Sequence, residues 1–165
     1  MKPSFRQSSP RGPRRSFRVA LLALLGASTS AAPILLCGGR EVFLLDTATI
    51  QGGREEKLWR WTADDAPGLP DDLRRRFMNL DECKPVAGGR ILICASSGGC
   101  ALVERATGRA LWHAYVINAH SLELLPRGRV IAASSLGGDS LILFDLNRPG
   151  EPLWKTPLHS AHSVV

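Results

Sequence analysis

Three polar side chains recur at one position of a repeating pattern, and their types are the ones best suited to chemistry. Asp81, His120 and His162 each precede an apolar run, at a spacing of about 40 residues. Imidazole is a common metal ligand that titrates near neutral pH, and two imidazoles with one carboxylate suit a divalent transition metal. We expect the three to form a ligand site, or a metal site in which all three are ligands. Asn118, Lys84 and Glu123 lie close by in the sequence and have weaker claims to ligand binding.

The same pattern also has a purely structural interpretation. Repeats create equivalent positions whatever their role, so the three side chains could instead hydrogen-bond to backbone groups between neighbouring units. The sequence has no closely spaced His-x-His or Cys-x-x-Cys, and no dinucleotide-binding, P-loop or Gly-x-Ser-x-Gly motif. No catalytic residue is therefore identified, and a divalent metal is the single cofactor for which the sequence offers candidate ligands.

The elements that must position these residues are short apolar runs broken by Gly and Pro, a pattern typical of strands and tight turns. Runs of one kind are 34–37, 91–94 and 130–133, and runs of a second kind are 42–46, 101–104 and 141–145. A third kind contains Leu-Trp, ending at Trp59, Trp112 and Trp154. Together with a strand that opens at Asp81 or His120, each unit has four strands: inner, second, third and outer.

Four-stranded units that cannot bury both faces alone must stack on their neighbours, and a radial stack of such sheets is a β-propeller. The sequence therefore predicts an all-β fold, an incomplete β-propeller of about three four-stranded antiparallel blades. The predicted bounds are 33–63 for blade 1, 64–78 for an insertion, 79–117 for blade 2, 118–159 for blade 3, and 160–165 for the start of blade 4. A β-sandwich is the alternative. Inner strands line a propeller's channel, so the three polar residues are expected at its mouth.

Two further expectations follow from the repeat. Blade 1 has no inner strand and 160–165 only begins one, whereas closed rings usually need at least four blades. We therefore expect the remaining blades to come from a longer parent chain or from another chain. Trp59, Trp112 and Trp154 are predicted to be structural, each packing against the adjacent blade. The insertion predicts a short helix over 70–78, with Pro and Asp early and Arg late, near the channel mouth.

The first 32 residues have the order of a secretory signal peptide: a basic stretch, an apolar run from Val19 to Ala27 and then small residues. Arg14 and Arg15 resemble a twin-arginine motif, so both the Sec and the twin-arginine routes stay open. The apolar run is too short for a membrane span, so no span is expected after cleavage. The predicted location is periplasmic or extracellular.

The net charge of +6 belongs to this leader. The first 32 residues hold six Lys and Arg and no Asp or Glu, so the other 133 residues carry 15 of each sign. Net charge therefore gives no support for a nucleic-acid partner. An oxidising compartment would allow disulfides, and Cys94 and Cys100 could pair across a hairpin. The alternative is that the cysteines are small buried residues, since Cys37 and Cys94 occupy the same repeat position.

The segment from Glu104 to Trp112 resembles the repeat of quinoprotein-type propellers, with an acid, Thr-Gly and then Trp. His120 with Pro126 and Gly128 resembles a pattern of several exported bacterial propellers, including arylsulfotransferases. Over residues 33 to 165 the chain looks like an uncharacterised family of exported bacterial propellers. The resemblance implies a propeller fold, export and a longer parent protein. It transfers neither catalytic residues nor the quinone cofactor.

The first functional hypothesis is an exported propeller scaffold that binds a glycan, another small molecule or a partner at its channel mouth. The alternative, suggested by the resemblance, is an enzyme, either a lyase or a sulfotransferase, with His120 as acid/base or metal ligand.

Overall fold

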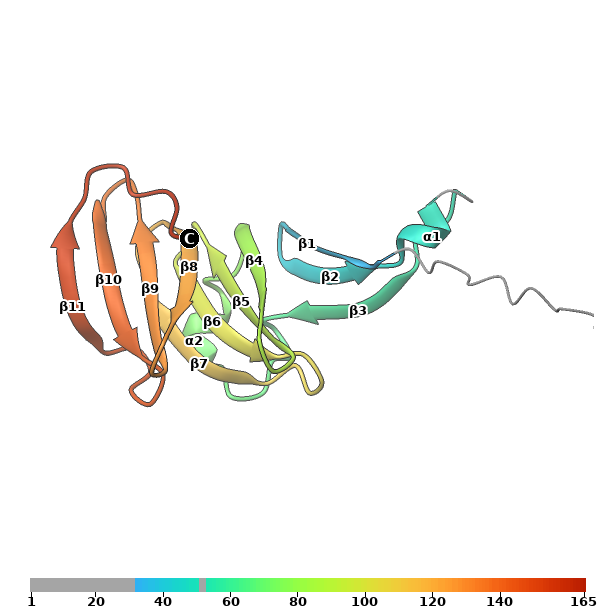
Figure 1. Cartoon of the computed structure of the whole chain (residues 1–165), viewed down its shortest axis with the longest axis horizontal. Coiled ribbons are helices and arrows are strands. Elements are labelled where there is room, and N and C mark those ends of the chain that lie inside the picture. The colour runs from blue at the N-terminus through green and yellow to red at the C-terminus, as the bar shows by residue number, and fades with distance from the viewer. Residues whose placement is uncertain (1–31, 51–52) are drawn as a thin grey trace, which may run out of the picture.

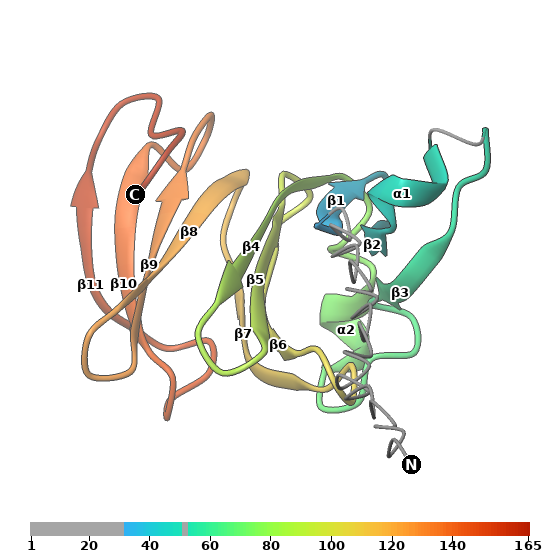
Figure 2. The same cartoon turned by 45° about the vertical axis from the view of Figure 1, so that its right-hand side comes forward.

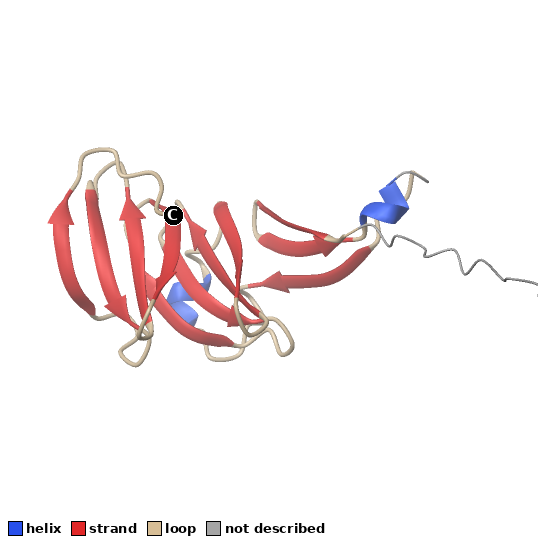
Figure 3. Ribbon diagram, in the orientation of Figure 1, coloured by secondary structure: helices blue, strands red, loops and turns tan. Residues whose placement is uncertain are grey.

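Antiparallel strands in three sheets make up the fold of the computed structural model, which describes residues 32–50 and 53–165 (Figures 1 and 3). The predicted signal peptide, apart from its last residue, lies outside the described residues. Within the described ranges, no helix has the length and apolar character needed to cross a bilayer.

Each sheet is a simple meander in which strands adjacent in sequence pair with each other. Blade 1 consists of β1 (Ile34–Gly38), β2 (Glu41–Leu45) and β3 (Lys57–Thr62). Blade 2 consists of β4 (Leu80–Val86), β5 (Arg90–Ala95), β6 (Gly99–Glu104) and β7 (Ala110–Tyr115), and blade 3 of β8 (Ala119–Leu125), β9 (Arg129–Ser134), β10 (Ser140–Asp145) and β11 (Pro152–Pro157). Two four-residue helices, α1 (Thr47–Ile50) and α2 (Asp71–Arg74), interrupt the strands.

The predicted phase of the repeat is confirmed. β1, β5 and β9 are the strands expected at the second position, and the Leu-Trp segments fall in β3, β7 and β11. In blade 1 the described residues contain three strands, beginning at this second position, as predicted. β1 packs against β4, and β5 packs against β8 in the same way, so the blades follow one another side by side (Figures 1 and 2). The fold is an incomplete β-propeller of three blades, and not a sandwich.

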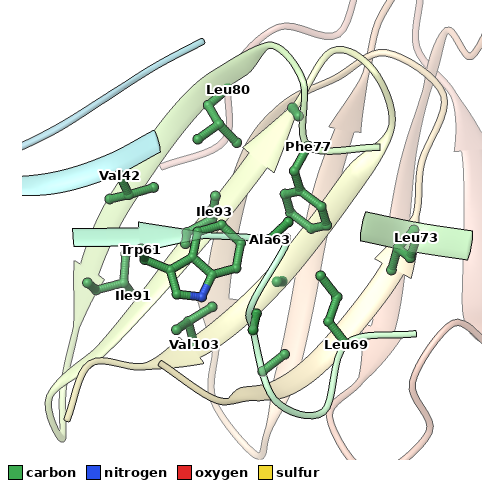
Figure 4. Packing of buried hydrophobic residues seen from close by; sticks show 14 residues of the cluster. Val42, Trp61, Ala63, Leu69, Leu73, Phe77, Leu80, Ile91, Ile93 and Val103 are labelled. Atoms are coloured by element: carbon green, nitrogen blue, oxygen red, sulfur yellow. The ribbon is translucent and has the colours of Figure 1, made fainter. Parts of the chain in front are cut away.

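Apolar side chains fill the spaces between neighbouring blades. The first core cluster lies between blades 1 and 2 and includes Trp61, whose ring meets Phe77 edge-on at a centroid distance of 5.6 Å (Figure 4). The second lies between blades 2 and 3 and includes Trp112, whose ring meets Phe144 at 5.4 Å. Blade 2 contributes to both clusters, which explains why β5 and β6 are apolar nearly throughout, as strands covered on both faces are.

The three repeat tryptophans are not equally buried, and for one of them the prediction of a core position is wrong. Trp112 is 0% exposed, Trp59 is half-buried beside the first cluster, and Trp154 is 50% exposed. The position faces the next blade in sequence order. Trp154 lies on β11, the outermost strand of blade 3, and no described blade covers it.

The helix in the insertion is shorter than the sequence predicts. The predicted helix over 70–78 is α2 at 71–74, followed by turns. Leu73 and Phe77 are buried in the first core cluster, and the Arg76 guanidinium stacks on Tyr115 of β7 at 4.9 Å. A Cβ on Gly99 of β6 would lie 2.6 Å from the Phe77 ring. The insertion therefore packs against β6 and β7 of blade 2, beside which Figure 2 shows α2.

Candidate functional site

A β-bulge at the start of each complete inner strand positions the candidate residues. In β4 the pairing with β5 passes from Leu80 to Glu82, and in β8 the pairing with β9 passes from Ala119 to Ser121. Asp81 and His120 are the unpaired residues. A bulge bends the strand and redirects its side chain. Because the buried Leu80 and Ala119 anchor the preceding position, both polar side chains leave the sheet at the same point of the repeat.

The three residues that recur in the sequence lie together in the structure. The Nδ1 atom of His120 is 3.6 Å from Oδ1 of Asp81, across the boundary between blades 2 and 3. The His120 and His162 rings have centroids 4.8 Å apart and are tilted by 47°. The Asp81 and His120 side chains are 29% and 24% exposed, and His162 is exposed. The cluster is therefore sheltered on one side and open to a ligand on the other.

Asp81 is held by the backbone as well as by His120. Its Oδ2 atom accepts a hydrogen bond from the Ser96 N–H, in the turn after β5. One oxygen thus fixes the carboxylate and the other faces the imidazole. Since Nδ1 of His120 faces Asp81, Nε2 lies on the opposite side of the ring. At 3.6 Å the two groups approach closely without forming a hydrogen bond.

His162 lies in the segment that follows blade 3, and the contacts of this segment hold it beside β8. Ala161 is buried, as Leu80 and Ala119 are at the same repeat position. The Val164 N–H donates to Oγ of Ser121 at 3.2 Å, which ties the segment to β8. Residues 160–165 thus run beside the inner strand of blade 3, as the start of a further inner strand would, although they do not form a strand.

Lys84 and Glu123 lie deeper along the inner strands, in contacts that join blades 2 and 3. Nζ of Lys84 is 2.9 Å from Oε2 of Glu123 and 3.5 Å from Oε1 of Glu82, and it donates to the Leu122 and Val164 carbonyls. Burial alone would lower the pKa of Lys84, but the two glutamates outweigh it and raise the pKa. Both residues therefore join blades 2 and 3. Few of their polar atoms remain free to bind a ligand.

Sequence reasoning missed Glu82, which also takes part in this interblade contact. Its two carboxylate oxygens accept hydrogen bonds from the Ser121 hydroxyl at 3.0 Å and the Leu122 N–H at 2.8 Å. The available signal was an acidic residue at a position next to Cys83 on a predicted inner strand. Asn118, predicted as a ligand residue, has φ of 46° and donates to Ser135, so it serves the turn that leads into β8.

None of the four cysteines forms a disulfide in the structure. Cys94 and Cys100 are direct cross-strand neighbours in β5 and β6, and both are fully buried. Among residues 32–50 and 53–165, no group of three or more His, Cys, Asp and Glu has the spacing of a metal site.

Solved structures with the same architecture are β-propellers. The WD40 propeller domain of Doa1 superposes with a TM-score of 0.56 at 15% identity, covering 79% of this chain and 38% of that one. BamB from Moraxella catarrhalis matches with a TM-score of 0.49 at 15% identity, covering 81% of this chain and 36% of that one. The chain thus spans less than two-fifths of either structure, and at this identity the likeness to Doa1 shows the fold alone.

Sequence comparison adds a family but no activity. No curated protein sequence matches the chain significantly. A family model described as a family of unknown function, DUF6528, matches residues 35–147, which run from β1 to just beyond β10. The match covers most of the three blades and both bulges, and the chain therefore belongs to the DUF6528 family.

Proposed function

We propose that this protein is a β-propeller scaffold that binds a small polar ligand at its channel mouth, through His120, His162 and Asp81. The observation that carries the proposal is the contact between the two imidazoles beside one carboxylate, built from residues about 40 positions apart. Two histidines and an aspartate from neighbouring inner strands form a convergent polar group of the kind that fixes a ligand's orientation.

Each of the three residues has a distinct part in this proposal. Asp81, already bound to the Ser96 backbone, lies beside Nδ1 of His120 and contributes the carboxylate of the site. His120 presents Nε2 on the side away from Asp81, and the exposed His162 ring lies next to it. Neutral imidazoles would accept hydrogen bonds from glycan hydroxyls or coordinate a divalent metal, and protonated ones would bind an anion. The proposed ligand is accordingly a glycan fragment, and the alternative is a divalent metal ion held by the two imidazoles and not by all three side chains, which together lack the spacing of a metal site.

The test uses ring resonances of the histidines in NMR, with two probes: Zn²⁺ and a panel of mono- and disaccharides. A binding probe should shift the His120 and His162 signals and leave those of His159 unchanged. His159 is the matched control, because its Nδ1 also faces a carboxylate, that of Asp139 at 3.5 Å, but its side chain is 88% exposed.

The His120→Ala variant should lose the response and His159→Ala should keep it. Equal shifts at His159, or binding that survives His120→Ala unchanged, would refute the site. Chemical turnover of a saccharide probe, lost with His120→Ala, would instead favour the lyase or sulfotransferase alternative.

We also propose that the protein is exported, with residues 1–32 as the leader, and that further blades complete the ring. The order of basic, apolar and small residues supports export, and the exposed Trp154 on β11 supports a neighbouring blade on that face. N-terminal sequencing of secreted protein should find a start near Ala32. An uncleaved cytosolic product would contradict export.

A further inference from the structure

Two thiols from different blades lie against each other outside the candidate site. Cys37 is on β1 of blade 1, and Cys83 is on β4, the strand of blade 2 against which β1 packs. Both side chains are half-buried beside the first core cluster. The two side chains lie close enough for each to perturb the pKa of the other thiol. They therefore meet across a blade boundary, at a place that small molecules in solution can approach.

The equivalent positions at the next blade boundary show that the fold does not need two thiols there. They hold Cys94 on β5 and Leu122 on β8, both 0% exposed within the second core cluster. At these two positions apolar side-chain packing is sufficient, beside the polar contacts that Glu82 and Lys84 make between blades 2 and 3. The pair of facing thiols is thus specific to the boundary between blades 1 and 2, and its chemistry needs a separate explanation.

We propose that Cys37 and Cys83 form a reversible disulfide that joins blade 1 to blade 2. With oxidised glutathione as the oxidant, the thiolate of one of the two cysteines attacks one glutathione sulfur, breaks the S–S bond and releases one glutathione thiolate. The thiolate of the other cysteine then attacks the protein sulfur of the mixed disulfide and releases the second glutathione. The protein gives up two protons and two electrons, and glutathione disulfide is reduced to two thiols.

The bond would add a covalent link between blade 1 and the rest of the described chain. Closing a loop of about 45 residues in the unfolded chain is expected to raise the melting temperature by roughly 10 °C. In an oxidising compartment blade 1 would be fixed to blade 2, and in a reducing one the bond would open. The disulfide thus couples the stability of the first blade to the redox state around the protein.

The test equilibrates the purified, reduced full-length chain in glutathione buffers of increasing oxidised fraction, followed by alkylation and peptide mass spectrometry. The expected product is a Cys37–Cys83 linkage, with Cys94 and Cys100 still alkylated after unfolding. Cys94 and Cys100 are the internal control, because burial raises the pKa of both thiols. Cys37→Ser and Cys83→Ser should each abolish both the linkage and the rise in melting temperature, and Cys94→Ala should retain both.

Two results would overturn the proposal. One is that Cys37 and Cys83 stay separately alkylated in fully oxidised glutathione. The other is a bond whose formation leaves the melting temperature the same as that of oxidised Cys83→Ser. Since neither measurement involves the histidine cluster, failure here would leave the proposed ligand site untouched.

Discussion

Replacing the three repeat tryptophans by alanine, one at a time, tests whether packing between blades holds the fold together. Trp112 is 0% exposed and meets Phe144 edge-on. Trp→Ala in a core costs about 3–5 kcal/mol, including the aromatic pair. Trp154 occupies the same repeat position but is 50% exposed, so its loss should cost less than about 1 kcal/mol. The half-buried Trp59 should fall between the two.

The assay is urea unfolding followed by circular dichroism, comparing midpoints at constant slope. The expected order of destabilisation is Trp112, then Trp59, then Trp154. If Trp112→Ala is too unstable to purify, Trp112→Leu should keep the same rank with a smaller loss. A cost for Trp154→Ala equal to that for Trp112→Ala would refute the reasoning, because it would require another surface to cover β11 in solution.

Three further predictions concern single contacts. The Trp61 indole donates to a backbone carbonyl at 3.0 Å, whereas the buried indole N–H of Trp112 has no partner in the described part of the chain. In urea unfolding, Trp61→Phe should therefore cost about 1 kcal/mol more than the loss of ring volume alone. Trp112→Phe should cost less than its loss of ring volume, because it also removes a buried N–H group without a partner in that part of the chain. Lys84→Met should cost about 2 kcal/mol of unfolding free energy in the same assay. This is less than for a fully buried ion pair, because the Lys84 side chain is 25% exposed. Lys84→Arg should retain part of the stability that Lys84→Met loses. Burial lowers the folded-state pKa of His113 below 6.5, so the unfolded state binds the proton first and stability should fall as pH drops through about 6.5 and below; His113→Gln should flatten this part of the pH profile of stability, and His159→Gln should not.

The repeat made the architecture predictable, because three copies in phase assign each apolar run to a strand position without any long-range information. The meeting of His120 and His162 was predictable for the same reason: inner strands of a propeller start at one end of the channel, so residues at their starts converge. The roles of side chains that contact the neighbouring blade were not predictable. The role of Glu82 follows from the Ser121 hydroxyl and Leu122 N–H of the next blade, which its own repeat does not reveal.

Other differences have local physical causes. The predicted helix over 70–78 ends at Arg74 because the backbone that follows bonds to the turn between β5 and β6: the Arg76 carbonyl accepts from the Gly99 N–H, and the Met78 N–H donates to Oγ of Ser97. α1 was not predicted, since its four residues have no helical periodicity; its first turn is capped by Asp46, whose Oδ1 accepts the Ala48 N–H at 2.9 Å. The exposure of Trp154 depends on which blade stands next to it. A repeat pattern assigns a residue to a face, but burial depends on what covers that face.

The bulges that carry Asp81 and His120 have a consequence for how recognition of the proposed ligand could change within this family. Aspartate stands at the bulge of blade 2 and histidine at that of blade 3, while the flanking residues on both strands keep the same pairing. The backbone geometry therefore does not depend on which side chain the bulge presents. Ligand preference could diversify blade by blade through substitutions at this one position, with the surrounding sheets left intact.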